Sequence, residues 1–494
     1  MNKIIQINPA DNVAVALEAI EAGGEARFGA AAVTAAQAVP AGHKLALRDI
    51  AQGGDIIKYG YPIGVATRRI AAGQWVHTHN VKTGLGDLLD YTYSPSFSVS
   101  PAQKPDTFMG YMRKDGKVGI RNEVWIVPTV GCVNSIARQI EEKSQKFLAD
   151  GIDGIFSYTH PYGCSQLSQD LLNTQLALSG LIRHPNAAAV LVLGLGCENN
   201  HIEALKKVLG GTDSNRVKFL VCQDEKNETE AALKIMEELC AYAARCRRTP
   251  CSTAHLIAGL KCGGSDGFSG ITANPLAGVF SDMLIARGGT AVMTEVPEMF
   301  GAETVLMSRC RDKTVFDKTA ALINDFKRYF VSYDQKIDAN PSPGNKAGGI
   351  TTLEEKSLGC IQKGGVSPVN DVLAYGQPVK ETGLNLLQAP GNDLVSSAAL
   401  AVSGTQLVLF TTGRGTPFGC PVPTVKISTN SELFRRKPGW IDFDAGELLR
   451  GKTLAALGGE LYNYVLQVAS GAQKTKSEAF DKHDFAIFKD GVTL

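Results

Sequence analysis

The stretch AVLVLGLGCENNH, residues 189–201, joins an uninterrupted apolar run to a polar cluster directly behind it. Such a run, bounded by turn residues, is typical of a strand buried on both faces in a parallel sheet covered by helices. The polar cluster then falls just beyond the carboxyl end of the strand, where open α/β sheets bind their ligands. The stretch therefore predicts a doubly wound α/β domain with a functional site at one edge of its sheet.

Two earlier stretches end in the same way, so that three cysteines each follow a predicted strand. WIVPTVGCVNS reaches Cys132, GIFSYTHPYGCSQ reaches Cys164, and the first stretch reaches Cys197. Cysteines spaced about one βα unit apart are expected to converge at one sheet edge, where we expect the chemistry. Three interpretations stay open: core thiols, a nucleophile among them, or ligands of iron, because soft thiolates select iron or zinc over magnesium.

Composition narrows the class of protein. With 494 residues the chain is too long for one core. The formal net charge of +1 argues against nucleic-acid and membrane partners. No apolar run approaches the ~20 residues that span a bilayer, and the amino end has no signal region. We expect a cytoplasmic enzyme that acts on a small molecule, and we allow for a homodimer. Eleven cysteines without a signal peptide do not indicate a disulfide framework.

The first hundred residues contain an internal repeat. Residues 39–45, 50–56 and 70–76 share the order apolar, two small or polar residues, glycine, two more, apolar. Each copy predicts a short strand, a glycine turn and a second strand, and hence a small all-β module.

The predicted architecture is a multidomain α/β protein that begins with this module. Alternating strand and helix patterns indicate a doubly wound α/β domain behind it. A glycine-rich remainder with long polar loops indicates a larger α/β domain that carries the catalytic residues. The predicted boundaries are 1–92 for the module, 93–106 for a proline-rich linker, 107–251 for the doubly wound domain and 252–494 for the catalytic domain.

The histidines of the module are candidate ligands. His77 and His79 are two residues apart, and residues two apart in a strand face the same side. Both imidazoles can then reach one metal ion or one anionic ligand; the alternative is that two half-exposed side chains have no function. His43 follows the turn glycine of the first copy.

Glycine-rich loops of the last domain suit an anionic, hydroxylated ligand. Gly263–Asp266 and Gly413–Thr416 offer backbone N–H groups beside a hydroxyl and a charge, as loops that hold carboxylates or phosphates do. Arg414 can hold a carboxylate through two parallel hydrogen bonds. The alternative for each loop is a plain turn. Dinucleotide binding is disfavoured, because the segment beginning at Gly194 lacks the third glycine of the fingerprint.

Taken together, the motifs resemble the altronate/galactarate dehydratase family from about residue 5 to the carboxyl end. The segments that carry the resemblance are GHKLALRDI, HTHN, VGIRNEVWIVPTVGCVN, YGCSQL, GLGCEN, CGGSDGFSGITANP, TEVPEMFGAE, NPSPGNKAGG and FTTGRGTPFG. HTHN, Cys360 and the ending GVTL resemble the altronate branch. The resemblance implies that the first module is a SAF (antifreeze-like) β-clip domain. It also implies an iron-dependent hydro-lyase, with Mn²⁺ able to replace Fe²⁺, that converts D-altronate to 2-dehydro-3-deoxy-D-gluconate and water.

Within that resemblance, the chemistry suggests roles for the candidate residues. A base must take the C2 proton, an acid must protonate the leaving C3 hydroxyl, and a cation must stabilise the doubly charged carboxylate. The hypothesis makes His43 or Lys346 the base and His77 with His79 metal ligands or the acid. Further candidates are Ser265, Asn345, Arg414 and Thr416 for holding substrate, Asp266, Glu295 and Glu298 as acids or ligands, and Cys132, Cys164 and Cys197 as metal ligands, with an iron–sulfur cluster left open. The alternatives are dehydration of galactarate or another sugar acid, and a non-catalytic sugar-acid binding protein.

Overall fold

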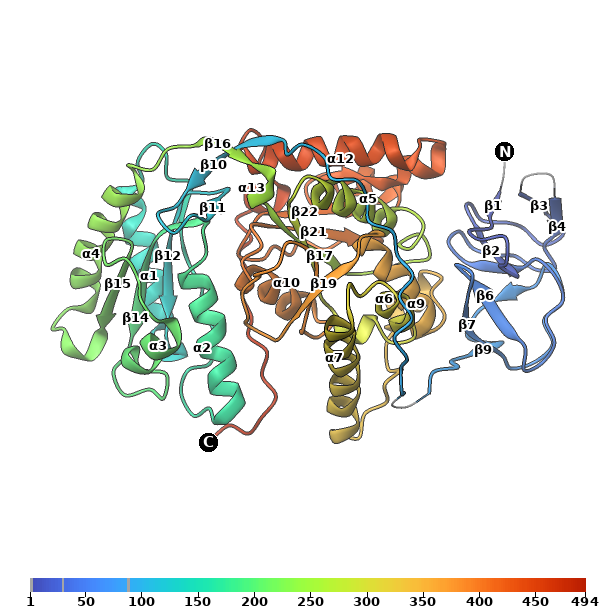
Figure 1. Ribbon diagram of the computed structural model, residues 1–494, viewed down its shortest axis with the longest axis horizontal. Helices are drawn as coiled ribbons and strands as arrows, with labels where there is room; N and C mark the ends of the chain where they lie inside the picture. Colours follow the sequence, from blue (N-terminus) through green and yellow to red (C-terminus); the bar gives the residue numbers. More distant parts are fainter. Residues whose placement is uncertain (1–2, 29–30, 87–88) are drawn as a thin grey trace.

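Three units follow one another along the chain in the computed structural model, which describes residues 3–28, 31–86 and 89–494 (Figure 1). A strand-rich module comes first, and two α/β units with parallel sheets follow, which confirms the predicted fold class. The module lies at one end of the molecule, the second unit at the other end and the C-terminal unit between them (Figure 1).

The N-terminal module is built from short strands joined by glycine turns. Gly23, Gly42, Gly53 and Gly73 all have φ between 77° and 80°, a left-handed conformation that glycine adopts without steric cost. The turn at Gly23 belongs to a fourth copy of the repeat, residues 20–26, which the sequence analysis missed. The sheets are β1-β2-β5-β8, β3-β4 and β6-β7-β9, with bounds Ile4–Ile5 (β1), Val13–Ala16 (β2), Glu25–Phe28 (β3), Ala31–Thr34 (β4), Lys44–Ala46 (β5), Asp55–Lys58 (β6), Tyr61–Ala66 (β7), Trp75–Val76 (β8) and Val81–Lys82 (β9).

The strand predicted to carry His77 and His79 ends before both of them. Strand β8 stops at Val76, and residues 77–80 form a turn closed by a hydrogen bond from Asn80 N to His77 O of 3.0 Å. The premise that the two imidazoles share one face of a strand is therefore wrong. The turn buries His77 and leaves His79 exposed.

Residues 93–106 run as an extended segment along the C-terminal unit (Figure 1). Ser96 N donates to Ser308 O at 2.7 Å, and Gln103 N donates to Ala286 O at 2.7 Å. The segment leads into strand β10 (Thr107–Met112), which pairs with β11 (Val118–Gly119) and with β16 (Thr249–Ser252). Pairing of β10 with β16 thus joins the beginning of the second unit to its end.

The second unit contains the stretch that predicts the fold. Strand β14 (Ala187–Gly194) is buried along its whole length in a parallel sheet of order β13-β12-β14-β15, with α2 and α3 packed on one face and α1 and α4 on the other. The prediction of a doubly wound sheet is confirmed, and its strand order reverses between β12 and β14. The other bounds are Glu123–Pro128 (β12), Gly154–Ser157 (β13), Val217–Val221 (β15), Asn134–Ser144 (α1), Ser168–Ile182 (α2), Ile202–Leu209 (α3) and Glu228–Ala243 (α4).

The C-terminal unit is a seven-stranded parallel sheet of order β19-β20-β18-β17-β21-β22-β23. An apolar core that includes α10 and the face of α2 joins it to the second unit. Its strands are Ile257–Cys262 (β17), Thr290–Met293 (β18), Val369–Leu373 (β19), Gly383–Leu387 (β20), Leu407–Thr412 (β21), Thr424–Ser428 (β22) and Phe443–Asp444 (β23). Its helices are Ala273–Ala286 (α5), Glu303–Met307 (α6), Lys313–Ser332 (α7), Pro343–Ala347 (α8), Leu353–Cys360 (α9), Asp393–Val402 (α10), Ser431–Arg436 (α11), Leu454–Ala469 (α12) and Lys476–Ala479 (α13).

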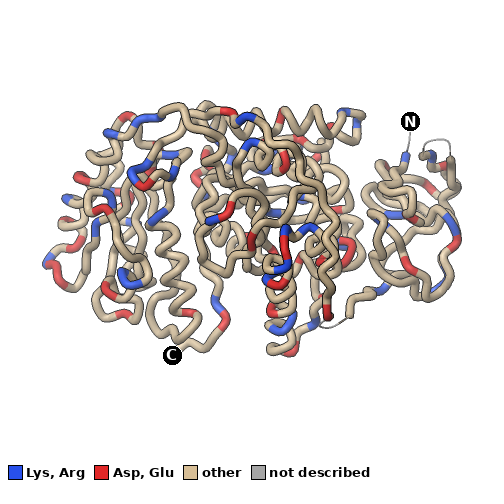
Figure 2. Tube along the Cα trace, in the orientation of Figure 1, with Lys and Arg blue, Asp and Glu red and all other residues tan. Residues whose placement is uncertain are grey.

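Positive and negative residues are interspersed along all three units (Figure 2). Within the described residues, the helices are all too short or too polar to cross a bilayer.

Candidate active site

The strand order of the C-terminal sheet reverses between β17 and β21, the type of position at which open α/β sheets bind ligands. Strand β17 ends at Cys262 and its loop begins at Gly263, and the loop after β21 begins at Gly413. The two loops are joined, because Gly413 N and Arg414 N both donate to Gly264 O at 3.0 Å. Two glycine-rich loops that the sequence singled out therefore meet at the switch point.

Glu295 holds the end of strand β17 from within the protein. Its side chain is fully buried and contacts Lys261 and Lys363, the latter at 2.8 Å, while Cys262 N donates to its Oε2 at 3.0 Å. Its backbone is left-handed (φ 71°, ψ 56°), a strained conformation for a residue with a side chain. Burial raises the pKa of Glu295, and the two lysines oppose that rise. Glu295, predicted to be catalytic, therefore fixes the loop that carries Cys262.

A cavity of about 500 Å³ opens beside this buried carboxylate. Its lining comes from loops that follow β17, β18 and β20, from helices α7, α8 and α9, and from the segment between α7 and α8. The polar residues that line it are Cys262, Glu298, Asn340, Ser342, Asn345, Lys356, Asn392 and Asp393. The lining offers many donors and acceptors, as a polyhydroxylated ligand requires.

An ion pair stands in the wall of the cavity. Lys356 Nζ lies 2.8 Å from Glu298 Oε1, and both side chains are buried. The same ammonium donates to Asn340 Oδ1 at 3.0 Å and to Asn345 Oδ1 at 3.3 Å. Burial alone would raise the pKa of Glu298, but the attraction of Lys356, Lys261 and Lys363 outweighs it and lowers the pKa to about 2. Glu298 is therefore an anion at neutral pH, and Lys356 stays a cation that also holds two amides.

Two thiols lie next to this pair. Cys360 Sγ is 3.0 Å from Glu298 Oε2, and Cys262 Sγ is 2.9 Å from Ser265 Oγ. The pKa of Cys262 is lowered to about 5 by its hydrogen bond with the Cys360 thiol and by Lys363, against the effect of burial. The pKa of Cys360 is raised well above its usual value by the same hydrogen bond and by burial. At neutral pH Cys262, which lines the cavity, is therefore a thiolate, and the buried Cys360 beside Glu298 is a thiol.

Helix α9 connects the cavity to the N-terminal module. Its Lys356 and Cys360 face the cavity region, while its Glu355 accepts from Lys44 and Lys58 of the module at 2.8 Å each. All three of these side chains are buried, and the two lysines lower the pKa of Glu355 to about 2 against the effect of burial. The module thus fixes the helix that supplies Lys356, the cation in the lining of the cavity.

His43 and His77 lie together on the module, against helix α8. Their ring centroids are 5.0 Å apart, and the Trp75 ring packs against both imidazoles and against His79. His43 Nδ1 accepts from Trp75 Nε1 at 3.2 Å, and its Nε2 lies 3.3 Å from Ala347 O. Burial lowers the pKa of His43, and lowers that of His77 to about 4, so both imidazoles are neutral at pH 7.

Of the residues predicted to hold the substrate, only Asn345 lines the cavity. Asn345 Nδ2 donates to Ser265 O at 2.8 Å, so these two residues lie together, and Asn345 lines the cavity. Arg414 is exposed, and Thr416 Oγ1 accepts from Phe418 N at 3.3 Å within its own loop. Lys346 is half-buried on α8, next to the Ala347 carbonyl that His43 contacts.

The carboxylate of Asp266 is held by hydrogen bonds from neighbouring residues of the protein. Its carboxylate accepts from Thr429 Oγ1 at 2.9 Å, from Phe268 N at 3.1 Å and from Asn430 Nδ2 at 3.3 Å, and burial raises its pKa. These bonds tie the loop after β17 to the loop after β22. Asp266 is absent from the lining of the cavity.

The three strand-end cysteines lie in the second unit, away from the cavity. Cys132, Cys164 and Cys197 are exposed, on loops that contact one another through hydrogen bonds from Gly131 N to Tyr162 O (2.8 Å) and from Asn200 N to Gly163 O (2.9 Å). The loops converge as predicted, but their thiols do not line the cavity of the C-terminal unit.

The five predicted metal ligands form two separate groups. The module with His77 and His79 and the sheet edge with the three thiols stand at opposite ends of the molecule, so one ion cannot bind both groups (Figure 1). In the described part of the chain, no three His, Cys, Asp or Glu side chains are gathered in a way that could hold a metal ion.

Sequence reasoning missed Cys262, Lys261, Lys356 and Asp393 as members of the site. Cys262 stands directly after an apolar strand and before Gly263-Gly264, the same signal that selected the other three cysteines. Lys356 gave no such signal, because LEEKSLGC does not show which of its charges becomes buried.

All three units match parts of one enzyme family. Residues 2–84 match the altronate/galactarate dehydratase SAF domain, residues 110–244 the second domain of D-galactarate dehydratase/altronate hydrolase, and residues 253–493 the C-terminal domain of D-galactarate/altronate dehydratase. The chain belongs to the D-galactarate/altronate dehydratase family.

Within the family, altronate dehydratases are the more similar relatives. The chain is 54% identical to altronate dehydratase of Escherichia coli (strain K12) over 493 residues, 99% of each chain. It is 51% identical to altronate dehydratase of Bacillus subtilis (strain 168) over the full length of both. It is 33% identical to galactarate dehydratase (L-threo-forming) of Escherichia coli, over 98% of this chain and 96% of the relative.

Proposed function

We propose that the protein is a hydro-lyase that dehydrates D-altronate to 2-dehydro-3-deoxy-D-gluconate. The observation that carries the proposal is the cavity at the switch point of the C-terminal sheet, with Lys356, Glu298 and a Cys262 thiolate in its wall. Identity above 50% to two altronate dehydratases over the whole chain supports this substrate.

The reaction needs three things from the cavity. The C2–H bond breaks, and its proton passes to a base. The electron pair of that bond forms the C2–C3 double bond. The C3–O bond breaks as an acid protonates the C3 hydroxyl, which leaves as water. The enol then becomes the 2-keto-3-deoxy acid. While the C2 proton is leaving, negative charge grows on the substrate carboxylate, and a fixed cation stabilises it.

Lys356 is the cation that we assign to the carboxylate. It is held by Glu298, Asn340 and Asn345, so it is positioned before the substrate arrives. Asn345 and Ser342 supply further hydrogen bonds, and Ser265 fixes Asn345 through its carbonyl.

We assign the base to a residue on or beside helix α8 and the acid to a residue beside Glu298. His43 is a neutral imidazole, the form that accepts a proton, and Lys346 directly precedes Ala347, whose carbonyl His43 contacts. His43 Nδ1, the nitrogen that can take up a proton, already accepts from the Trp75 N–H, and Nε2–H faces Ala347 O, so His43 acts as the base only if its contact with Trp75 opens. For the acid role we assign Cys360, whose thiol holds a proton at neutral pH and lies 3.0 Å from the Glu298 carboxylate in the cavity wall.

We propose iron(II) as the cofactor, with Mn²⁺ as its substitute. The neutral imidazole of His77 is a donor type that suits iron, whereas among the described residues neither it nor the three thiols belong to a gathered set of three metal donors. A bound divalent cation would supply further stabilisation of the substrate carboxylate. Metal analysis after anaerobic purification tests this: His77→Ala should lower the iron content, and a triple alanine variant of Cys132, Cys164 and Cys197 should not. The opposite result places iron at the thiols.

A discontinuous assay for 2-keto-3-deoxy acid tests the function. D-Altronate should give product, and galactarate and other sugar acids should give much less. Faster turnover of galactarate would replace the proposed substrate, and no product from any sugar acid with added iron would favour the binding-protein alternative.

We also propose that the protein acts in the cytoplasm. All eleven cysteines are free, as in a reducing compartment.

A further inference from the structure

A second cavity, of about 560 Å³, lies in the second unit, far from the candidate active site. It is bounded by the β10–β11 hairpin, the turn after α2 and the end of α4. Six cationic side chains line it, against two carboxylates, Asp115 and Asp213. The cations are Arg113, Lys114, Lys117, Arg183, Arg216 and Arg245.

This charge balance is unusual for a chain whose formal net charge is +1 and whose charges are interspersed (Figure 2). The two carboxylates are already engaged, Asp213 with Lys114 at 2.8 Å and Asp115 with Lys117 at 3.8 Å. Four positive charges therefore remain without a carboxylate partner in the lining of the cavity.

Two of these four cations are packed into the protein. Arg113 donates to Pro185 O, Asn122 Oδ1 and Arg121 O at 2.8–3.0 Å. Arg216 donates to three carbonyls of the turn at 182–187, at 2.8–3.0 Å. Among the described residues, neither guanidinium lies within ion-pair distance of a carboxylate. Burial, and the repulsion of Arg113, lower the pKa of Arg216 to about 10.

Neutral carbonyls do not balance this charge. The C-terminus of α2 offsets at most about half an elementary charge. Each guanidinium has five N–H groups, of which the bonds above use three, so donors remain for a ligand. Two cations held close together at a cavity are costly unless an anion binds between them.

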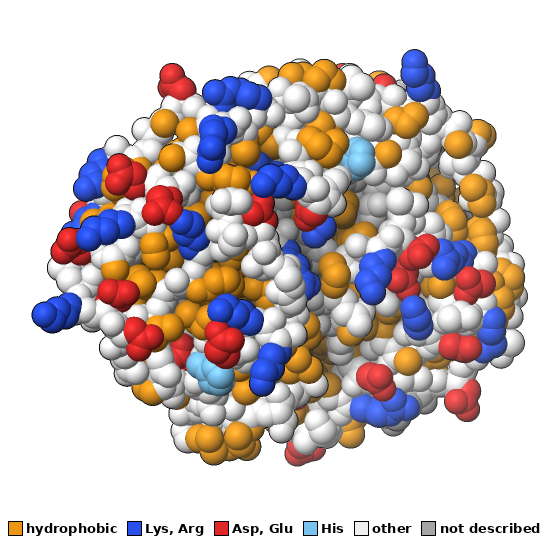
Figure 3. All heavy atoms as spheres, turned by 60° about the vertical axis from the view of Figure 1, so that its left-hand side comes forward, with side chains coloured by type: hydrophobic (Ala, Val, Ile, Leu, Met, Phe, Trp, Pro, Cys, Tyr) orange, Lys and Arg blue, Asp and Glu red, His pale blue; other side chains and the backbone are white. Residues whose placement is uncertain are grey.

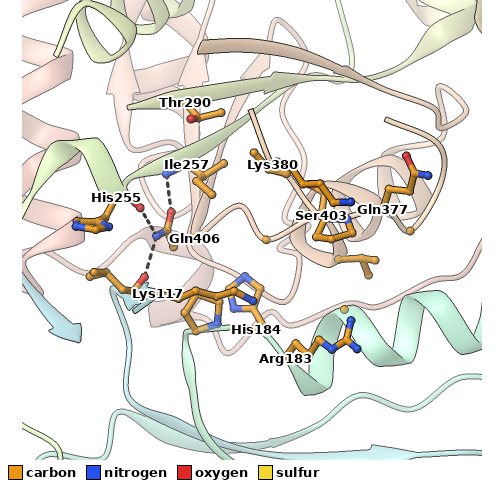
Figure 4. Close-up of a pocket in the computed structure, with 18 of the residues that line it drawn as sticks. Lys117, Arg183, His184, His255, Ile257, Thr290, Gln377, Lys380, Ser403 and Gln406 are labelled. Atoms are coloured by element: carbon orange, nitrogen blue, oxygen red, sulfur yellow. Dashed lines mark hydrogen bonds between the residues drawn. The ribbon is translucent and has the colours of Figure 1, made fainter. Parts of the chain in front are cut away.

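A second chamber, of about 360 Å³, is drawn in Figure 4 and shares lining residues with the first. Lys117, Arg183 and Pro185 line both chambers. In Figure 4, Lys117, His184 and Arg183 of the second unit face Thr290, Ser403 and Lys380 of the C-terminal unit across this space. The surface is visibly hollowed between the two larger units, with Lys and Arg side chains beside the hollow (Figure 3).

The second chamber suits the neutral part of a ligand. Leu176, Val379 and Val402 give it an apolar wall. The buried hydroxyl of Ser179, also in its lining, has no hydrogen-bond partner within the described residues. A buried hydroxyl without a partner costs stability until a ligand or water bonds to it.

We propose that the paired chambers form a binding site for a small organic phosphate, separate from the catalytic cavity. The phosphate lies among Arg113, Arg216, Arg183 and Arg245, and the organic part extends toward Ser179. Guanidinium groups and a surplus of several charges suit a dianionic phosphate better than a single carboxylate. Because both units line the second chamber, the bound ligand tightens the contact between them.

Isothermal titration calorimetry of the full chain at constant ionic strength tests the proposal. The probes are glycerol 1-phosphate and inorganic phosphate, with chloride as the reference anion. Arg183→Gln with Arg245→Gln, both exposed at the rim, should weaken binding of both phosphates at least tenfold. The matched control, Lys104→Gln with Arg435→Gln, removes two exposed cations elsewhere and should leave binding unchanged.

Four outcomes decide the matter. Absence of binding by the wild type, or equal binding by the rim variant, overturns the site. Loss of binding in Lys356→Met instead would place the phosphate in the catalytic cavity and also overturn it. The ester should bind more tightly than inorganic phosphate; equal affinities would remove the second chamber from the proposal.

Discussion

The carboxylate of Glu355 on helix α9 lies 2.8 Å from Lys44 Nζ on strand β5, and neither side chain is exposed to water. Lys58 Nζ approaches the other carboxylate oxygen at the same distance. The residue after Glu355 is Lys356, which lines the catalytic cavity. A contact between two units therefore determines the position of a charge at the active site.

Replacement of Glu355 by Gln should destabilise the protein strongly. It leaves Lys44 and Lys58 buried without a carboxylate, and breaking a buried pair in this way typically costs about 3–5 kcal/mol. Urea unfolding measures the loss, and proteolysis in residues 93–106 should become faster. Asp49→Asn, which removes an exposed pair with Arg69, should leave stability nearly unchanged, because water screens such pairs. Equal effects of the two substitutions would contradict the interpretation of this contact.

The same carboxylate predicts a dependence of stability on acid pH. The pKa of Glu355 in the folded protein is about 2, below its ordinary value. Its contribution is therefore fully present above the pKa of the unfolded chain, ~4.3, and is lost as the pH falls toward 2. Melting temperatures between pH 5 and pH 2.5 should fall more steeply for the wild type than for Glu355→Gln. Parallel curves would show that Glu355 is not held as an anion.

Lys356→Met should lower kcat/KM by at least about 100-fold, or roughly 3 kcal/mol of transition-state stabilisation. The substitution also leaves Glu298 buried without its nearest cation, so it should lower stability. The double variant Lys356→Met/Glu298→Gln separates the two effects, because it removes the unpaired charge. Stability should return in the double variant while activity stays low; recovery of activity would show that Lys356 has a structural role only.

The sequence predicted those elements whose patterns are local. Strand β14 is apolar along its whole length because both faces are covered, and glycine turns recur at the spacing of the repeat. The strand containing His77 and His79 was predicted wrongly, because Asn80 closes a turn through its side chain, with Oδ1 accepting from His77 N at 2.9 Å. The rule that residues two apart in a strand face the same side does not detect such a turn.

The site could be predicted only in part, because its charges are buried by tertiary contacts. Asn345 and Ser265 are 80 positions apart in sequence, and one hydrogen bond joins them. Glycine-rich motifs identified both. Lys356 lies in a helix of which every residue is buried, and nothing in its sequence distinguishes it from a solvated lysine. Asp266 was chosen for its charge, yet its bonds to neighbouring loops give it a structural role.

Cys262 should contribute a thiolate that titrates near pH 5. Its pKa is lowered, so the thiolate is present above that pH and is protonated below it. The ultraviolet absorbance of the wild type minus that of Cys262→Ala measures the Cys262 thiolate. This difference should fall as the pH is lowered from 7 to 4. Cys132→Ala provides the control, because this exposed cysteine lies outside the cavity. A difference that titrates only above pH 8 would contradict the assignment.

Gly413→Ala should disrupt the switch point of the C-terminal sheet. A Cβ at this position would lie 2.2 Å from Asp266 Cγ, and the carboxylate is held by Thr429, Ser269 and Phe268, so it cannot move aside without losing these bonds. The expected loss is about 1–3 kcal/mol or more in the free energy of unfolding, together with a loss of activity, because the same loop contacts Gly264 beside Cys262.

Gly344→Ala is the matched control. No atom lies within 4 Å of its Cβ, and alanine is the better residue in a helix, so stability should stay equal or rise slightly. Comparison of the two variants by urea unfolding and by turnover of altronate separates close packing at Asp266 from the general effect of replacing glycine. If Gly413→Ala keeps both stability and activity, the Asp266 side chain moves freely and does not fix the two loops.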